Sequence, residues 1–344
     1  MLVAMQPPPD SATSAPDPVI PQQAPLDGAV LVVIVLATHN GETHLRQQLE
    51  SIAAQTYPNW HLLARDDVSS DGSCAILNEF QRELAGRVTI LSAPDLNRGP
   101  LRNFSDLIEA ALAAERPWSR QRFCIALCDQ DDHWRPDRLA RGVEALFTQP
   151  DREPCLVHSD LAVIANDGAV IAKRFTAYQG LNPRHNRFAD LLLTNIVTGC
   201  TITLNTELAR KVVPIPEHAV MHDWWIALVA ALTGRIVFVD APLVGYRQHG
   251  RNTLGAREDL RRSVINRIRA LTSPRNDQAF RAVARQAARI ADSRPRGLTL
   301  RGRFAAWVAS TLLRPSSRCL RLLGIVGLRL LAGRRPVRRR AAAS

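Results

Sequence analysis

The residues with the clearest capacity for chemistry are three carboxylates within four positions, Asp129, Asp131 and Asp132, which follow an apolar run at residues 123–127. Carboxylates this close repel one another, and a half-buried cluster is unfavourable unless a cation neutralises it. A hard divalent cation meets this need, and Mg²⁺ commonly joins protein carboxylates to substrate phosphates. The cluster therefore predicts a site for Mg²⁺ or Mn²⁺ that binds a diphosphate. The alternative is an acidic helix start, since a helix is expected a few residues later.

Two other polar groups also come directly after apolar runs. Asp66 and Asp67 could accept hydrogen bonds from a nucleobase or a ribose. The alternative for this pair is a surface turn, because the pattern Asp-Asp-x-Ser-Ser-Asp-Gly has strong turn chemistry. Thr38 and Asn40 form a polar loop after the first apolar run of the chain. Both groups are candidates for binding a nucleotide.

Candidates for a second substrate lie further along the chain. Asp223 opens an expected helix at residues 223–232 and could be a general base that deprotonates an acceptor hydroxyl. The alternative for Asp223 is a helix N-cap. Trp224 and Trp225 follow it. We expect one of these indoles to stack on an acceptor sugar and the other to belong to the core.

A polar segment begins at Tyr246, after an expected strand and a turn at Pro242. Arg247 could bind a diphosphate, because a guanidinium pairs with phosphate oxygens through two parallel hydrogen bonds. His249 could be a metal ligand, as imidazoles often are. Taken in isolation, the segment is equally typical of a surface loop.

Alternating strand and helix patterns position these groups. Residues 29–37 form a continuous run rich in β-branched side chains, which is typical of a strand buried on both faces of a parallel sheet. Strands and helices then alternate, with strands expected at 60–64, 88–91 and 123–127 and helices at 42–54, 71–84 and 101–114. This rhythm predicts an α/β fold with an open, doubly wound sheet. Because ligands bind at the carboxyl ends of the strands in such sheets, the polar groups there predict a nucleotide site.

The second half of the pattern is more mixed, and composition divides the chain into three parts. Strand-like segments occur at 155–164, 170–175, 196–204 and 235–239. Residues 1–29 are a Pro-rich leader that we expect to be disordered, residues 30–258 are a single α/β domain, and residues 259–344 are an Arg-rich helical tail. From residue 261 onward the chain has 21 Arg, no Lys and two acidic residues, a net charge of +19. The first 260 residues carry 23 basic and 30 acidic residues, a net charge of −7.

The basic tail suits either nucleic acid or an anionic membrane face. Its apolar segments at 304–313 and 320–331 are too short to span a bilayer, and Arg residues flank or interrupt them. Amphipathic helices of this kind lie in the interface of an anionic membrane. The alternative is a helical subdomain that packs on the body of the protein.

The N-terminal sequence and the cysteine pattern indicate the cellular compartment. The first residues show no secretory pattern, and the six cysteines form no CxxC pair and no disulfide framework. We therefore expect buried free thiols and a cytoplasmic protein, peripheral at the inner face of the cell membrane. Zinc binding by the cysteines is an alternative, although they lack the usual ligand spacing.

Several motifs, in order along the chain, resemble glycosyltransferase family 2, and especially its bacterial rhamnosyltransferase-like members. The resemblance covers about residues 30–255. It rests on Thr38-His39-Asn40, Asp66-Asp67-x-Ser-x-Asp71-Gly72-Ser73, Asn97-x-Gly99, Asp129-Gln130-Asp131-Asp132-x-Trp134, Thr198-Gly199-Cys200, His222-Asp223-Trp224-Trp225 and Tyr246-Arg247-Gln248-His249-Gly250. Such a resemblance implies a GT-A fold, a nucleotide-sugar donor, one divalent metal ion and inversion at the anomeric carbon.

The resemblance also implies roles for single residues. Asp223 matches the catalytic base, and Trp224 and Trp225 lie beside it on the acceptor side. Two positions depart from the family pattern, His39, where Tyr is frequent, and Val68, where Gly or Asn is common. Together with the predictions made above, the expected donor contacts are Thr38, Asn40, Asp66, Asp67, Asn97, Gly99, Asp129 and Arg247, and the expected metal contacts are Asp129, Asp131, Asp132 and His249.

These features predict an inverting glycosyltransferase that serves surface polysaccharide synthesis, with a glycan or lipid-linked acceptor. Rhamnose from dTDP-rhamnose is implied by the resemblance alone. A nucleotidyltransferase would use a similar acidic sheet edge, but the Gly-rich basic phosphate loop it needs is not supplied by residues 38–41. A nucleic-acid-binding protein would use the Arg tail. The acidic body and the lack of interleaved aromatic residues in the tail argue against this alternative, so we expect no nucleic-acid partner. A third alternative is an inactive carbohydrate-binding relative, which the retained carboxylates disfavour.

Overall fold

The computed structural model describes residues 30–113, 115–119, 121–150, 152–248, 277–292, 300–313 and 318–332. The predicted leader at residues 1–29 and the predicted domain boundary after residue 258 both lie outside these ranges. His249, a predicted metal ligand, also lies outside them.

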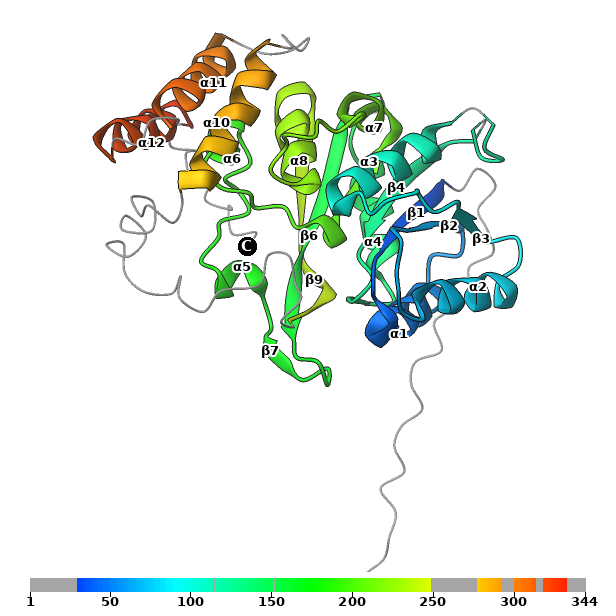
Figure 1. Ribbon diagram of the computed structural model, residues 1–344. Coiled ribbons are helices and arrows are strands. Elements are labelled where there is room, and N and C mark those ends of the chain that lie inside the picture. The colour runs from blue at the N-terminus through cyan, green and yellow to red at the C-terminus, as the bar shows by residue number, and fades with distance from the viewer. Residues whose placement is uncertain are drawn as a thin grey trace, which may run out of the picture.

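The first half of the described chain forms the parallel part of one mixed sheet (Figure 1). Its strand order is β3-β2-β1-β4, and these four strands are parallel to one another. The strands are β1 (Leu31–Thr38), β2 (Trp60–Asp66), β3 (Val88–Leu91) and β4 (Phe123–Cys128). The four strands predicted from the apolar runs are therefore confirmed, with ends shifted by one or two residues.

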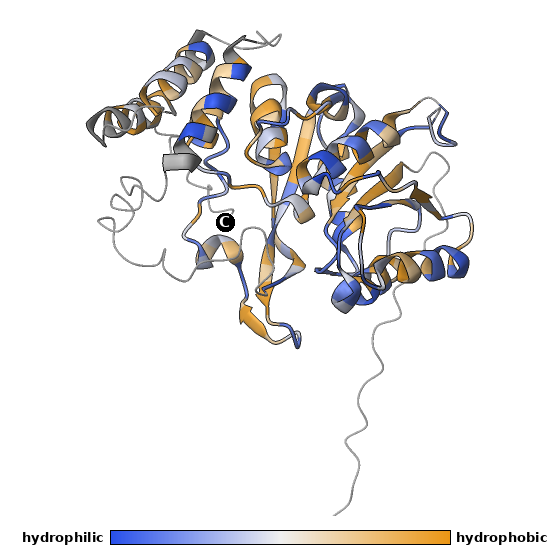
Figure 2. Cartoon of the chain, in the orientation of Figure 1, coloured by the Kyte–Doolittle hydropathy of each residue, from blue (hydrophilic) through white to orange (hydrophobic). Residues whose placement is uncertain are grey.

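Helices cover both faces of this sheet, which explains the continuous apolar character of β1. Alternate residues of β1 enter two different cores, Val33 and Val35 on one face and Ile34 and Leu36 on the other. The first core is shared with α3 (Gly99–Leu112), and the second with α1 (Glu42–Ala53) and α2 (Ser73–Glu83). Figure 2 shows the strands of the sheet as predominantly hydrophobic, as burial on both faces requires.

The second half of the sheet is mixed. Beyond β4 the order continues β8-β6-β9-β5, with β8 antiparallel to both neighbours and β6 parallel to β9. The strands are β5 (His133–Trp134), β6 (Cys155–Ile164), β7 (Val170–Ala172), β8 (Thr203–Asn205) and β9 (Arg235–Arg247), and β7 pairs with β6 outside the main path. The GT-A fold has such a mixed sheet with flanking helices.

Three predicted strands differ from the structure. The strand predicted at 170–175 ends at Ala172, and Phe175 begins the helix α5 (Phe175–Tyr178). The segment 196–204 is not a continuous strand, because a 3₁₀ turn, η1 (Gly199–Thr201), precedes the short β8. β9 does not end at 239 but continues to Arg247, since Pro242 lies opposite Asp160 where the β6–β9 register shifts. A strand tolerates proline at such an irregularity. Arg247 therefore belongs to the end of a strand and not to a loop.

Further helices cover the mixed half and the end of the molecule. They are α4 (Arg138–Phe147), α5 (Phe175–Tyr178), α6 (Phe188–Leu191), α7 (Thr206–Val212), α8 (His222–Thr233), α10 (Asp277–Asp292), α11 (Leu300–Leu312) and α12 (Arg318–Ala332). α11 packs between α10 and α12, and both α11 and α12 contact α6 (Figure 1). Buried residues of all three C-terminal helices, such as Ala287, Ala306 and Leu328, join the same core as α3. The described part of the tail is thus helical and packs on the body, and no helix within the described ranges has the length and apolar character needed to cross a membrane.

Candidate active site

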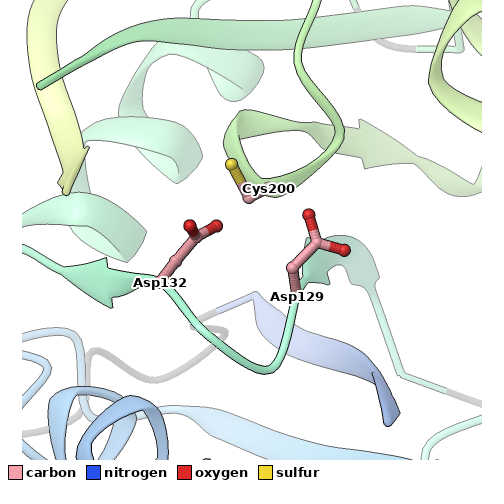
Figure 3. A group of neighbouring side chains, drawn as sticks. All are labelled: Asp129, Asp132 and Cys200. Carbon is pink, nitrogen blue, oxygen red and sulfur yellow. The ribbon is translucent and has the colours of Figure 1, made fainter. Parts of the chain in front are cut away.

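Asp129 and Asp132 begin and end the loop between β4 and β5, at the carboxyl end of β4. Figure 3 shows their carboxylates facing a shared space together with the thiol of Cys200. The ligand atoms of the three side chains all lie within 4.8 Å of one another. The predicted acidic cluster is therefore a real cluster in space, and a cysteine from another element completes it.

Burial makes this cluster electrostatically demanding. Asp132 is 0% exposed, and its Oδ2 atom has no hydrogen-bond partner in the described structure. Burial, and then the charges of Asp131 and Asp129, raise the pKa of Asp132 well above its ordinary value. Burial, and then the charges of Asp131 and Asp223, raise the pKa of Asp129 to about 7. The cluster must therefore hold protons at neutral pH or be neutralised by a cation.

The donor atoms fit a divalent cation. A buried carboxylate oxygen without a partner, facing a second carboxylate, offers the oxygen ligands that Mg²⁺ and Mn²⁺ prefer. Asp129 and Asp132 are the residues that would hold such an ion. Asp131, also predicted as a ligand, lies in the same loop and contributes its charge, but its carboxylate is outside the group of three. Its role as a ligand stays a prediction.

Cys200 was not predicted as a site residue, although its motif was noted. It reaches the cluster because β8 pairs antiparallel with β4, with Thr203 opposite Ala126. This pairing brings the turn before β8 to the end of β4. Burial, and then the charges of Asp132 and Asp129, raise the pKa of its thiol well above the ordinary value. The isolated cysteine has no ligand spacing, so only the strand pairing could have revealed its position.

The η1 turn also reaches the predicted base. The backbone N–H of Gly199 donates a 3.2 Å hydrogen bond to Oδ2 of Asp223. On the other side of the turn, the Cys200 carbonyl accepts a 3.0 Å hydrogen bond from Nη2 of the buried Arg138. A Cβ atom on Gly199 would lie 2.8 Å from Nε2 of His222, so this close approach requires glycine.

Asp223 lies in the first turn of α8, and the N-cap of that helix is Met221. Burial raises the pKa of Asp223 to about 7, although hydrogen bonds from the backbone N–H groups of Trp224 and Gly199 partly oppose the shift. The charge of Asp223 in turn raises the pKa of Asp129. The structure thus brings the predicted base close to the acidic cluster, with a pKa near neutrality as general bases require.

Arg247 is buried by contacts within the protein. Its Nε donates to the Asp131 carbonyl at 3.1 Å, and Nη1 donates to the carbonyls of Ala165 at 3.2 Å and Asn166 at 2.6 Å. Nη2 donates to Oε1 of Gln47 in α1 at 2.9 Å. The guanidinium therefore fastens the acidic loop to the sheet and to α1. Its predicted contact with a diphosphate stays a prediction.

The predicted nucleoside contacts at the ends of β1 and β2 form one network. Thr38 lies opposite Asp66 in the parallel register and donates to its Oδ1 atom at 2.9 Å. The hydroxyl and the backbone N–H of Ser69 donate to the same carboxylate, at 2.5 and 2.7 Å. Asp66 is thus buried and held on three sides, which shapes the loop that follows β2.

Asp67 shapes the neighbouring loop in the same way. Its carboxylate accepts hydrogen bonds from the backbone N–H groups of Arg98, at 2.9 and 3.0 Å, and Gly99, at 2.7 Å. Gly99 has φ of 73°, in the left-handed region that favours glycine. Nδ2 of Asn97 donates to the Asp67 carbonyl at 3.1 Å. These predicted donor residues are brought together, and their contacts with a nucleoside stay predictions.

The loop after β1 is tied to both of its neighbours. Oδ1 of Asn40 accepts the N–H of Ser70 at 2.9 Å, and the N–H of Asn40 donates to Ser69 at 2.8 Å. On the other side, Gln130 of the acidic loop pairs with the backbone of His39, accepting its N–H at 2.7 Å and donating to its carbonyl at 3.0 Å. The side chain of Gln130 therefore connects the acidic loop to the predicted nucleoside loop, a role the sequence did not indicate.

The two predicted acceptor tryptophans are both anchored by their indole N–H groups. Nε1 of Trp224 donates to the Leu191 carbonyl at 2.6 Å, and Nε1 of Trp225 donates to the Val212 carbonyl at 3.0 Å. Both are partly buried and pack against the core of α3 and α8. Each keeps a partly exposed surface, so the prediction that one of them stacks on an acceptor sugar stands untested.

Parts of the chain are similar in sequence to known proteins. The model of the family described as Glycosyl transferase family 2 matches residues 33–202. An uncharacterised protein of Mycobacterium tuberculosis is 28% identical over 223 residues, which are 63% of this chain and 58% of that protein. dTDP-rhamnosyl transferase RfbG of Shigella flexneri is 26% identical over 231 residues, 64% of this chain and 74% of that protein. The chain thus spans less than two thirds of the mycobacterial relative's length.

A solved structure agrees with the fold. S. aureus TarS 1-349 in complex with UDP has a TM-score of 0.52 with this chain at 15% identity, covering 88% of this chain and 90% of that chain. At this low sequence identity, the similarity supports the fold alone. The chain folds as a GT-A domain, and its residues 33–202 match the model of glycosyltransferase family 2.

Proposed function

We propose that the protein is a metal-dependent, inverting glycosyltransferase that moves a sugar from a nucleotide donor to a hydroxyl of a glycan or lipid-linked acceptor. The observation that supports this proposal is the η1 turn, in which the N–H of Gly199 is bonded to Asp223 while the thiol of Cys200 faces Asp129 and Asp132, so that the predicted base lies beside the cation site. A base beside a cation site can act on an acceptor hydroxyl while the donor diphosphate is held. The match of residues 33–202 to the model of glycosyltransferase family 2 supports the same reaction class.

The proposed reaction is a direct displacement. Asp223 takes the proton of the acceptor hydroxyl as its oxygen forms a bond to the anomeric carbon of the donor. The bond from that carbon to the diphosphate oxygen breaks on the opposite face, and the nucleoside diphosphate leaves with the electron pair. When bound, a Mg²⁺ or Mn²⁺ ion stabilises the charge on the diphosphate. Asp129 and Asp132 would hold the ion, and Arg247 keeps their loop in place.

The donor we propose is dTDP-rhamnose, and the pathway is surface polysaccharide synthesis. The support is the relative RfbG, whose name gives it as a dTDP-rhamnosyl transferase. The rhamnosyltransferase-like motifs of this chain point the same way. Binding of a nucleoside diphosphate would use the loops organised by Asp66 and Asp67.

We also place the protein at the cytoplasmic face of a membrane, where a lipid-linked acceptor is found. Exposed apolar side chains on the C-terminal helices support this location. Phe304 and Trp307 of α11 are about half exposed, and their rings stack at 5.7 Å. Leu323 and Leu330 of α12 are still more exposed. Exposed apolar side chains on helices of a strongly basic segment suit the interface of an anionic bilayer.

A donor screen tests the proposed reaction. Full-length protein is incubated with Mn²⁺ or Mg²⁺ and a panel of nucleotide sugars, and both binding and slow donor hydrolysis are measured. We expect binding and hydrolysis that depend on the metal, and we expect dTDP-rhamnose to be preferred. Release of pyrophosphate from a sugar phosphate and a nucleoside triphosphate would instead indicate a nucleotidyltransferase. Folded protein that binds no donor, with or without lipid extract, would contradict the proposal.

A further inference from the structure

The Cys200 thiol is the third group around the space that Asp129 and Asp132 face (Figure 3). All three ligand atoms lie within 4.8 Å of one another, and Cys200 is 0% exposed. The fully buried Oδ2 atom of Asp132 has no partner in the described structure. The site therefore offers two hard oxygen ligands and one soft sulfur ligand to the same ion.

The backbone that carries the thiol is fixed independently of any ion. Arg138 donates to the carbonyl of Cys200, and it also donates to the carbonyl of Ile202 at 3.0 Å. The N–H of Gly199 is bonded to Asp223. Because both sides of the turn are held, the backbone of Cys200 cannot move away from the cluster without breaking these hydrogen bonds.

We propose that Asp129, Asp132 and Cys200 form a mixed carboxylate–thiol metal centre, in which Cys200 makes the site bind thiophilic ions such as Zn²⁺ more tightly than Mg²⁺ or Mn²⁺. This inference rests on the proposed function, because it sets the metal selectivity of the same site. Soft thiolates favour Zn²⁺, whereas carboxylates and water suit Mg²⁺ and Mn²⁺.

Two classes of ion then use the site differently. When Zn²⁺ or Cd²⁺ binds, a metal–sulfur bond replaces the S–H bond, and the proton passes to the buffer without any change of oxidation state. When Mg²⁺ or Mn²⁺ binds, the thiol keeps its proton, and the carboxylates are the ligands. A thiophilic ion therefore competes with Mn²⁺ for both carboxylates, with the sulfur as its additional ligand.

Cadmium titration tests this centre without relying on activity. Full-length protein freed of metal is titrated with Cd²⁺, and the ultraviolet charge-transfer band of a cadmium–thiolate bond is recorded. We expect a band that saturates when one Cd²⁺ ion is bound per protein molecule. Cd²⁺ should also displace Mn²⁺, which is measured by the rise in the electron paramagnetic resonance signal of free Mn²⁺. Cys200→Ser should abolish this band and weaken Cd²⁺ binding by at least about 10-fold, while Mn²⁺ affinity changes much less. Cys74→Ser, which removes an exposed thiol outside the cluster, is the matched control and should retain the band.

A second variant keeps the test decisive if Cys200→Ser does not fold. Asp132→Asn leaves the thiol in place but removes the charged ligand, and it should weaken Cd²⁺ and Mn²⁺ together. Retention of the band and of Cd²⁺ affinity in Cys200→Ser, or in Asp132→Asn, would overturn the proposed centre. Mn²⁺-dependent donor binding without a cadmium band would contradict this inference alone. A cadmium band in protein that binds no donor would contradict the proposed function instead.

Discussion

Arg247 donates a hydrogen bond from Nε to the carbonyl of Asp131, 3.1 Å away, and so ties the acidic loop to the end of β9. Arg247→Ala would remove the hydrogen bonds that this buried guanidinium donates to three part-buried carbonyls and to the side chain of Gln47. We expect a loss of about 3 kcal/mol in the free energy of unfolding, since a hydrogen bond with a charged partner contributes about 1.5–3 kcal/mol. Mn²⁺ affinity should fall as well, because the loop that carries Asp129 and Asp132 loses its anchor.

The measurement is urea unfolding together with Mn²⁺ titration. Arg235→Ala is the matched control, because Arg235 begins the same strand but pairs with Glu153 on the surface. An exposed ion pair contributes less than about 1 kcal/mol, and the control should bind Mn²⁺ normally. Equal effects of the two substitutions would show that Arg247 does not position the loop.

The substitution Asp223→Asn tests the proposed role of Asp223 as the general base. The amide keeps the size of the side chain, and its one oxygen can accept the N–H of either Gly199 or Trp224, but it cannot take a proton from the acceptor. We expect turnover to fall at least about 100-fold, with donor binding unchanged. Steady-state kinetics and donor titration measure the two effects. Normal turnover in this variant would remove the assignment of Asp223.

The activity of the wild-type protein should also depend on pH in a defined direction. Burial raises the pKa of Asp223 to about 7, and a base must be ionised to accept a proton. The rate should therefore rise with pH up to about 7 and then level off. A profile flat from pH 5 to 8 would contradict this role.

Metal binding should become more stabilising as pH rises. The pKa of Asp129 is raised to about 7, so its protonated form stabilises the metal-free fold at low pH. That contribution is fully present below about pH 4 and is lost as pH rises through about 7. A cation replaces the lost protons, so the increase in melting temperature caused by Mn²⁺ should be larger at pH 8 than at pH 5. Asp129→Asn should remove most of this difference, and a Mn²⁺ effect independent of pH would contradict the prediction.

Val68 carries a conformation that its side chain does not favour. Its φ is 63°, in the left-handed region, and a β-branched residue is strained there. This residue is the position where the family commonly has Gly or Asn. The left-handed conformation costs an ordinary residue about 1–2 kcal/mol, so Val68→Asn should stabilise the protein by about 1 kcal/mol.

Thermal and urea unfolding measure this effect. Leu96→Asn is the control, because Leu96 is an exposed loop residue that is not among those with positive φ. Its substitution should change the stability by less than about 0.5 kcal/mol. A loss of stability in Val68→Asn would show that the side chain makes a contact more valuable than the strain it carries.

Membrane binding is tested by flotation of full-length protein with anionic vesicles. The double substitution of Phe304 and Trp307 by Ser should reduce flotation strongly, since two exposed aromatic anchors are lost. The control replaces Val170 and Ile171 by Ser, two exposed apolar residues of β7, which lies well away from α11 in Figure 1. If both double variants float like the wild type, the helices do not form the membrane face.

Local patterns predicted the parallel half of the fold and much of the acidic site. The unbroken apolar run of β1 required helices on both faces, and the structure places Val33 and Ile34 in different cores. Asp129 and Asp132 could be found because a short loop after a strand keeps neighbours in sequence close in space. The carboxyl-end rule then placed them beside the loops of Asp66 and Asp67.

Groups brought in by long-range pairing could not be predicted. Cys200 reaches the cluster only because β8 pairs with β4, a register that no local pattern encodes. Arg247 was expected in a loop, because Pro242 indicated a turn. A register shift opposite Asp160 lets β9 continue past this proline, and Arg247 is buried at the end of that strand. Its contact with a diphosphate stays a prediction.

The η1 turn joins the proposed base to the proposed metal site. The N–H of Gly199 is bonded to Asp223 in α8, while the thiol of the next residue faces the acidic loop. A small shift of this turn would therefore move the proposed base and one wall of the metal site together. A Cβ atom on Gly199 would lie 2.8 Å from Nε2 of the buried His222, so a larger side chain at this position would force such a shift.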